Sequence, residues 1–422
     1  MLKRIDPHQA RVGMFVHKLE GSWFHHPFWR GRFLLTDEER ADKLRASNVA
    51  AVIIDTDKGC DLAGGDPVLT PSASASPPRR RRRMLTEDQK PGQLRRTSDW
   101  APQSIGREFG RAGQVADMGL KVISRAFIEA RLGKAVQPEE VAPVVEAVFA
   151  SVQRNPHAFN GLMRCKHEME FLFRHALATS ALMISLARQM KLSRQEVHVA
   201  GLVGLLMDSG MALLPSSDIW QGDPHAWPES VLREHVLYGR DFVSLGGFDE
   251  TVVRACYEHH ERMDGAGYPE AIKGEGISLM GRMAAICDAY DDLANPFAGN
   301  AISDPAQVIA QMQADVGAYD PDILREFIAA VGVYPIGSIV LLASHRLAMV
   351  VDQNLEDPAM PRVRCFYSLK VGGAVAQETI DLANCYGKDR IIGAADSDLL
   401  HGADLPDLGK MRMKLLAAAC AG

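Results

Sequence analysis

Between about residues 108 and 300, apolar residues recur at spacings of three and four, the period of an α-helix that buries one face. The pattern divides into seven segments, near 107–131, 138–154, 166–190, 194–208, 228–245, 249–260 and 278–294. Helices of this kind bury their apolar stripes against one another, so this part of the chain is predicted to fold as a helical bundle. A functional site in such a bundle is built from side chains on facing helices.

The segments on either side have a different character. Residues 1–65 alternate short apolar runs with turns, and 37–47 has helical spacing after a capping residue, Thr36, so a small α+β domain is predicted. At the other end, helical pieces precede β-like runs such as 338–342 and 347–351. The predicted fold class is therefore mainly α, with a small N-terminal α+β domain and a small C-terminal extension that contains β-structure.

A linker is predicted between the first domain and the bundle. Residues 71–78 are Pro, Ser and Ala, and five arginines follow at 79–83. This composition cannot bury enough apolar surface to offset chain entropy, so the segment is predicted to be disordered. Binding of nucleic acid or an acidic membrane by the arginine run is the less favoured alternative. The predicted divisions are 1–65 (α+β domain), 66–105 (linker), 106–302 (helical domain) and 303–422 (helix plus β extension).

Charge and cysteine usage narrow the class of protein further. A net charge of −6 argues against a nucleic-acid binder that acts through overall charge. The seven cysteines are dispersed without a CxxC pair, which indicates reduced thiols and a cytoplasmic location. Residues 1–8 lack the apolar core of a signal peptide, and the apolar run 199–207 is too short to cross a membrane. We therefore expect a soluble protein without a membrane partner.

One stretch, His259–Pro269, has the sequence HHERMDGAGYP. Adjacent histidines at a helix end can direct both rings into one cleft, because the irregular backbone there is free of helical angles. The glycines permit positive φ, and Pro269 prevents the helix from continuing. Taken alone, the His-His pair is more simply explained as a surface pair beside a loop.

Four more residues change that balance. His175, His235 and Asp288 lie on predicted apolar helices, and Asp208 ends one. Singly, each is more simply a satisfied core residue, although an unpaired buried carboxylate is costly. In their order along successive helices, together with the His-His pair, they make the imidazole and carboxylate set of a dinuclear metal site. Paired metals suit the hydrolysis of a phosphodiester.

The segment His259–Pro269 resembles the signature of the HD-GYP family, a branch of the HD phosphohydrolases whose bacterial members hydrolyse cyclic di-GMP. The resemblance covers roughly 120–365, and residues 19–28 resemble the small domain that often precedes HD-GYP domains. It implies an HD-type helical bundle and a signalling protein that acts on cyclic di-GMP or a related cyclic dinucleotide. Signalling partners and a homodimer are further expectations, and nucleic acid is not an expected partner.

The resemblance also implies residue roles. The metal ligands that it implies are His175, Asp208, His235, His259, His260 and Asp288, with Asp208 as the bridge between two divalent ions, iron or manganese. The residues that it places in catalysis or in the substrate loop are Asp208, Arg262 and Asp264, with Gly265, Gly267, Tyr268 and Pro269.

Four departures from the family pattern weaken the implied site. Met207 stands where the family has the histidine of its His-Asp pair, and a thioether is a poor ligand for hard ions. Met211 replaces a lysine that would face phosphate, 294–297 departs from an Asp-Arg-Pro-Tyr-like stretch, and Phe171 replaces a further carboxylate. The set of His175, Asp208 and Asp288 is therefore predicted to be less complete than the set of Asp208, His235, His259 and His260. It is also predicted to bind its metal ion more weakly.

Two functions follow as hypotheses. The first is a metal-dependent cyclic di-GMP phosphodiesterase in which metal-bound hydroxide attacks phosphorus, slowed by the loss of the histidine and the lysine. The second is a catalytically inactive HD-GYP module that binds nucleotide or a partner protein. A purely structural bundle does not explain so many polar residues at predicted buried positions.

Overall fold

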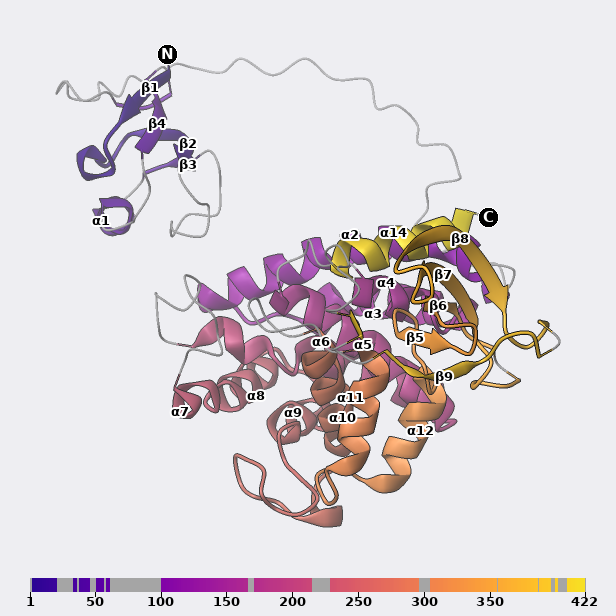
Figure 1. Ribbon diagram of the computed structural model, residues 1–422. Coiled ribbons are helices and arrows are strands. Elements are labelled where there is room, and N and C mark those ends of the chain that lie inside the picture. Colours follow the sequence, from indigo (N-terminus) through magenta and orange to yellow (C-terminus); the bar gives the residue numbers. More distant parts are fainter. Residues whose placement is uncertain are drawn as a thin grey trace, which may run out of the picture. The chain divides into compact units, whose positions relative to one another are not determined.

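The structure is a computed structural model, and two compact units make up the chain, Met1–Gln93 and Leu94–Gly422 (Figure 1). The residues that it describes are 2–20, 33–35, 38–45, 51–56, 58–60, 100–165, 171–214, 228–295, 304–354, 356–385, 387–395, 399–400 and 408–421. Of the predicted features, Thr36, most of 19–28 and the linker up to residue 99 lie outside these ranges. The last part of the predicted linker is ordered: the Trp100 ring packs edge-on against Phe149 at 5.6 Å.

The N-terminal unit contains a four-stranded antiparallel sheet, in the order β1-β4-β2-β3, and a helix. Its elements are β1 (Leu2–Ile5), β2 (Phe15–Glu20), β3 (Phe33–Leu34), α1 (Glu38–Arg45) and β4 (Ala51–Asp55). Its core is a small apolar cluster that includes Met14, Val16, Leu44 and Ile54, all fully buried. The predicted α+β character of this region is confirmed.

The second unit begins with the predicted helical bundle. Its helices are α2 (Ile105–Arg131), α3 (Pro138–Arg154), α4 (Ala158–Cys165), α5 (Phe171–Gln189), α6 (Arg194–Leu206), α7 (Glu229–Leu232), α8 (His235–Leu245), α9 (Glu250–Glu258), α10 (Leu279–Ala294), α11 (Pro305–Ala314) and α12 (Pro321–Val331). Each of the seven predicted segments contains a helix, and the segment 228–245 is divided between α7 and α8. Helices α11 and α12, beyond the predicted boundary at 302, contribute Val308 and Phe327 to the same core.

Helices α5 and α6 form the centre of the bundle. They approach closely because Gly201 and Gly204 carry no side chain: a Cβ on Gly204 would lie 2.6 Å from the backbone of Thr179. The hydroxyls of Thr179 and Ser180 lie 2.7 Å and 2.8 Å from the carbonyl oxygens of Gly204 and Gly201. This close contact places His175, which lies one turn before Thr179 on α5, next to the end of α6.

The stretch Arg194–Leu213 corrects one expectation. Its 20 residues, with a mean hydropathy of 1.3, are long and apolar enough to cross a membrane by length and composition. The prediction that no apolar run reaches that length is therefore wrong. However, 61% of the apolar window is buried inside the protein, as in the core helix of a soluble protein.

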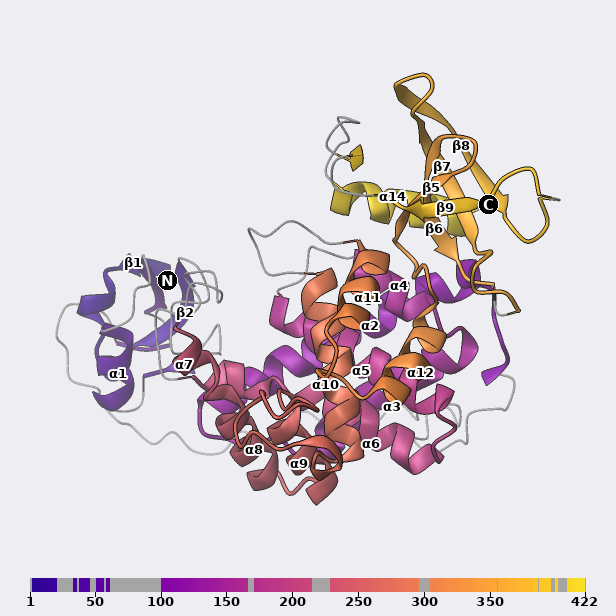
Figure 2. The ribbon, with the colours of Figure 1, turned by 60° about the horizontal axis from the view of Figure 1, so that its bottom comes forward.

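The C-terminal extension is a five-stranded antiparallel sheet, in the order β8-β7-β6-β5-β9, followed by a helix. Its elements are β5 (Ile339–Leu342), β6 (Arg346–Asp352), β7 (Arg362–Ser368), β8 (Gly373–Asp381), β9 (Ile391–Ala394) and α14 (Leu408–Ala421). Helix α14 packs against α2, α4 and β6, and the sheet has its own apolar core. The sheet lies at one end of the bundle, away from α8 and α9 (Figures 1 and 2).

Two buried arginines lie where the sheet meets the bundle. Arg164 donates to the carbonyl oxygen of Ile336 at 2.6 Å and to the hydroxyl of Tyr290 on α10 at 2.5 Å. Arg412 of α14 is 1% exposed, and its guanidinium lies 3.6 Å from the carboxylate of Asp304, which caps α11. These polar contacts tie the C-terminal extension to the helical bundle.

A buried histidine at this junction gives a pH-dependent stability. Burial and the charge of Arg164 lower the pKa of His157 from 6.5 to about 4. The unfolded chain therefore takes up a proton between these values before the folded chain does, so the free energy of unfolding falls as pH decreases through this window. The loss attributable to His157 is about 3 kcal/mol.

Urea unfolding across this pH range measures the effect. We expect His157→Gln to flatten the pH dependence of the unfolding free energy. Equal pH dependence in wild type and His157→Gln would contradict the assignment.

Candidate metal centre

The structure brings all six predicted metal-ligand residues together. They come from α5, the end of α6, the start of α8, the end of α9 and α10. They form a four-residue set (Asp208, His235, His259, His260) and a three-residue set (His175, Asp208, Asp288), with candidate ligand atoms within 4.8 Å of one another in each. Asp208 belongs to both sets, as expected of a residue that bridges two ions.

In the three-residue set, His175 is oriented by the carboxylate of Asp291, which belongs to neither set. Its Nδ1 lies 2.9 Å from Oδ2 of Asp291, and its Nε2 lies 3.0 Å from Asp288 and 3.1 Å from Asp208. Asn295 holds the other oxygen of Asp291 by donating to it at 2.8 Å. Because Asp291 holds the Nδ1 proton, the Nε2 atom, which faces two carboxylates, would offer its lone pair to a bound cation in place of a proton.

Sequence reasoning did not single out Asp291. Its signal is the spacing of three from Asp288, which places both carboxylates on one face of an apolar helix. The same spacing also fits an unrelated surface pair, so only the contact with His175 identifies its role.

In the four-residue set, two imidazoles face each other. Nδ1 of His235 lies 2.5 Å from the carbonyl oxygen of Leu232, and Nδ1 of His259 lies 2.7 Å from that of Cys256. Carbonyl oxygens only accept hydrogen bonds, so both Nδ1 atoms carry hydrogen, and each Nε2 is the ring atom that would offer a lone pair to a cation. These Nε2 atoms lie 3.2 Å apart, and Oδ1 of Asp208 lies 3.5 Å and 3.8 Å from them. A cation between them would be bound by both Nε2 atoms and by Asp208.

Charges in the cluster are strongly coupled. Burial opposes ionisation, yet hydrogen bonds from His175 and His259 hold the pKa of Asp208 well below its usual value. Burial likewise opposes the charge on His175, but its three carboxylate partners raise its pKa well above the usual value. Burial and the charge of His259 lower the pKa of His260. Oδ2 of Asp208 is buried, and it lies 3.1 Å from Nε2 of His175. This donor set, mixed imidazole and carboxylate around the shared Asp208, fits a divalent transition metal.

The comparisons with known proteins agree with this arrangement. The HD domain family matches residues 162–323, and a domain of unknown function (DUF3391) matches residues 2–141. The chain is 35% identical over 411 residues to the cyclic di-GMP phosphodiesterase PA4108 of Pseudomonas aeruginosa, covering 97% of this chain and 95% of that protein. The chain belongs to the HD-GYP family.

Two more distant similarities complete the comparison. The 3'3'-cGAMP-specific phosphodiesterase 1 of Vibrio cholerae is 26% identical over 159 residues, 36% of each protein. The solved structure of Bd1817, an HD-GYP-type protein from Bdellovibrio bacteriovorus, is 17% identical with a TM-score of 0.45, over 78% of this chain and 98% of that one.

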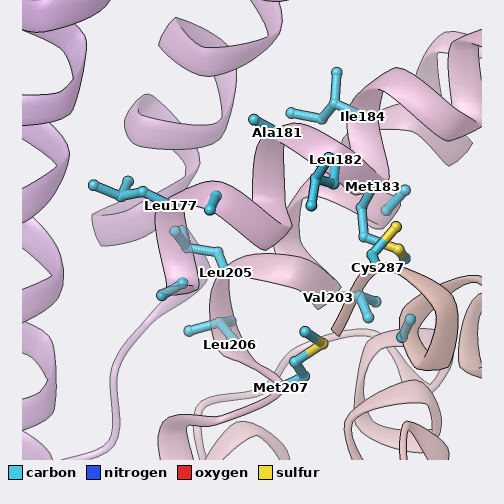
Figure 3. Close-up of a cluster of buried hydrophobic side chains, with 14 of the residues drawn as sticks. Leu177, Ala181, Leu182, Met183, Ile184, Val203, Leu205, Leu206, Met207 and Cys287 are labelled. Carbon is cyan, nitrogen blue, oxygen red and sulfur yellow. The ribbon is translucent and has the colours of Figure 1, made fainter. Parts of the chain in front are cut away.

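The departures from the HD-GYP pattern have a clear structural setting. Met207 is fully buried in an apolar cluster with Val203, Leu206 and Cys287 (Figure 3), so its thioether has apolar neighbours. Met211 is partly buried against the same core. These contacts explain how the bundle accommodates a methionine next to the shared aspartate.

Two further departures lie beside His175. The ring of Phe171, at the position of the family's additional carboxylate, stacks on the imidazole at 5.6 Å with an interplanar angle of 14°. Asn295, in the altered stretch after α10, accepts a hydrogen bond from Arg174 through its carbonyl oxygen at 2.9 Å as well as donating to Asp291. Asn295 therefore supports the three-residue set, whereas 296 and 297 lie outside the described residues.

The GYP loop after α9 is held by a carboxylate that sequence reasoning left out. Glu261 is 2% exposed and accepts hydrogen bonds from the backbone amides of Glu270 and Ile272 at 2.7 Å and 2.9 Å. Gly265 has φ of +79°, and a Cβ on Gly267 would lie 2.4 Å from the backbone nitrogen of Arg262. Both predicted loop glycines are thus required by the backbone.

The loop presents one aromatic ring to the metal cluster. The Tyr268 ring, which precedes Pro269, stacks on His260 at 4.7 Å with an interplanar angle of 23°. The side chain of His260 is 27% exposed, against 4% or less for His175, His235 and His259. The cluster therefore opens to solvent beside His260 and Tyr268.

Arg262 and Asp264 contact each other rather than the metal cluster. The Arg262 guanidinium lies 3.0 Å from Asp315 and 2.9 Å from Asp264, and hydrogen bonds to these two carboxylates raise its pKa. Asp264 also accepts the amide of Ala266 at 2.8 Å. These contacts fix the loop, so the geometry favours a positioning role for both residues over direct participation in catalysis.

Proposed function

We propose that this chain is a metal-dependent phosphodiesterase that hydrolyses a cyclic dinucleotide, with cyclic di-GMP as the substrate favoured by its 35% identity to PA4108. The observation that carries the proposal is the pair of metal-ligand sets that share Asp208. Two ions joined by one carboxylate are the arrangement that suits phosphodiester hydrolysis. Iron and manganese are the proposed metals, because imidazole and carboxylate donors suit both.

The six residues of the two sets would hold the ions. Bound there, the ions would activate water and offset the negative charge that develops on the phosphodiester. The protein's own part is orientation: Asp291 and two backbone carbonyls hold the Nδ1 atoms of His175, His235 and His259, so that each Nε2 is directed inward. Glu261 and the Arg262–Asp264 pair hold the loop that carries Tyr268 at the solvent-facing side.

A second candidate function rests on Met207. The Met207 thioether lies in an apolar cluster, so the three-residue set lacks the histidine that the family has at this position. If metal occupied this set only weakly, the protein would be a nucleotide receptor without catalysis. Because the other ligands and the loop are retained, the phosphodiesterase remains the favoured function.

One experiment separates these candidates. The purified full chain is loaded anaerobically with Fe(II) or Mn(II), and metal content, binding of cyclic di-GMP and its turnover are measured on the same sample. About two ions per chain and a linear product are expected. One ion or none, with binding but no product, would support the receptor. Neither binding nor product would exclude both functions.

Met207 and Met211 provide a second test. We expect Met207→His with Met211→Lys to raise metal affinity at the three-residue set by about 10-fold or more, because a ligand is restored. Turnover should rise as well, because a cation is restored at the phosphate. Titration with Mn(II) measures the affinity, and Met207→Leu is the matched control that keeps the apolar packing. No gain in either quantity would show that the methionine site is complete as it stands.

The setting of the protein is proposed on simpler grounds. All seven cysteines are free, which fits a soluble protein in a reducing cytoplasm. A signalling role and a homodimer are proposed from the resemblance to the HD-GYP family.

A further inference from the structure

Three planar groups lie close together at the open side of the metal cluster. The first two are the rings of His260 and Tyr268, at 4.7 Å. The third is the guanidinium of Arg233, whose Cζ lies 4.8 Å from the centre of the Tyr268 ring. A cation therefore lies against the Tyr268 ring at the open side of the metal cluster.

The backbone and one carboxylate hold Arg233 in place. It follows α7 directly and lies two residues before His235, so its position is coupled to that of a metal-ligand candidate. Glu229 accepts hydrogen bonds from its Nη2 and Nε at 2.6 Å and 3.1 Å. The side chain is 48% exposed, so it stays accessible to a ligand from solvent. Exposed pairs of this spacing are weak, so an anion of higher charge can take the place of Glu229.

The site needs such a cation. The cluster and its supports contain the carboxylates of Asp208, Asp288 and Asp291, and residue 211, where the HD-GYP resemblance implies a lysine, is an uncharged methionine. Arg262, the other arginine at the loop, is engaged by two carboxylates. A doubly anionic ligand that enters beside Tyr268 therefore encounters the Arg233 guanidinium.

We propose that Arg233 binds a phosphate of the cyclic dinucleotide and supplies the positive charge that Met211 does not. The guanidinium is planar and donates through a fork that matches two phosphate oxygens, while Tyr268 supports its face. The inference rests on the proposed function, since it assigns a residue to that substrate.

The test compares Arg233→Ala and Arg233→Lys with wild type, each loaded with Mn(II). We expect Arg233→Ala to raise KM for cyclic di-GMP about 10-fold or more with a smaller change in kcat, because the contact is made in ground and transition states alike. Arg233→Lys should recover part of the loss. Metal content should stay at the wild-type level, a result that separates loss of substrate binding from damage to the nearby His235.

The matched control is Arg125→Ala. Arg125 is exposed on α2 and pairs with Glu129 four residues away, as Arg233 does with Glu229, and it should leave KM at the wild-type value. Glu229→Gln should lower KM or leave it unchanged, because it releases Arg233 for the phosphate. A raised KM in this variant would count against the exchange of partners.

An arginine fork can bind either a phosphate or the edge of a guanine. Cyclic di-AMP has phosphates but no guanine, so it distinguishes the two contacts. A phosphate contact predicts that Arg233→Ala weakens binding of both dinucleotides, measured by calorimetry. Weakening for the guanine ligand alone would overturn the phosphate assignment in favour of the guanine edge. If wild type binds and Arg233→Ala binds equally well, this inference fails while the proposed function stands. If wild type neither binds nor hydrolyses a cyclic dinucleotide, both fall.

Discussion

Asp208→Asn should remove metal from both sets and lower turnover of a cyclic dinucleotide by about 10²- to 10⁴-fold. A change near one ion lowers metal affinity by about 10- to 100-fold. Asp208 belongs to both sets, so the loss applies at both ions. An amide has no negative charge, and its nitrogen would direct hydrogens at the space where an ion is expected. Metal analysis and steady-state kinetics on one preparation measure both effects.

Stability provides an independent measurement. Metal that binds the folded chain raises its melting temperature by mass action, and the rise disappears when the ligand set is lost. In Asp208→Asn, therefore, added Mn(II) should no longer raise the melting temperature. The metal-free variant should still fold, because Asp208 is 12% exposed at its side chain and the apolar core around Met207 is untouched.

The control is another aspartate at the N-terminal cap of a helix, outside the site. Asp249 caps α9 by accepting the amide of Thr251 at 2.8 Å, and Asp249→Asn should keep both ions and full turnover. If Asp208→Asn retains one ion, Asp208 serves one set only. If it retains two, the shared carboxylate is not a ligand.

The success of the sequence analysis in the bundle has a physical basis. Helix positions follow from the burial of one face, and 138–154 and 278–294 match α3 and α10 within a residue. The six metal-ligand candidates were recognisable because polar residues in apolar helices need partners, and the family resemblance then supplied their grouping. The structure added the distances that make Asp208 common to both sets.

What the sequence did not reveal depends on contacts between distant segments. Strand β8 was not predicted, because it lies at the edge of the sheet and carries exposed polar residues where a buried strand has an apolar run. Arg412 is buried, although arginine is a residue type that is almost always exposed, so the sequence alone predicts a surface position. Asp291 and Glu261 are recognisable only through His175 and the amides of the GYP loop.

A single methyl group tests how closely the end of α6 must approach α8. Gly210 lies in the short 3₁₀ helix Ser209–Leu213, directly after Asp208. A Cβ there would lie 1.9 Å from the carbonyl oxygen of His235 and 2.5 Å from the backbone nitrogen of Gly239. Because both obstacles are backbone atoms of α8, no side-chain rotation relieves the clash. Gly210→Ala must therefore displace α8, which carries His235, from Asp208.

The expected result is a loss of stability of about 3 kcal/mol or more. This corresponds to a melting temperature lower by about 6 to 12 °C. The four-residue set should lose metal affinity as well, because His235 moves. Gly110→Ala is the matched control: Gly110 lies in α2 with no atom within 4 Å of its added Cβ, so alanine should stabilise the helix by about 0.5 to 1 kcal/mol. Opposite shifts in the two variants would place the effect in the contact between the 3₁₀ helix Ser209–Leu213 and α8 rather than in helix propensity. A stable, metal-replete Gly210→Ala would mean that the four-residue set does not depend on this close approach.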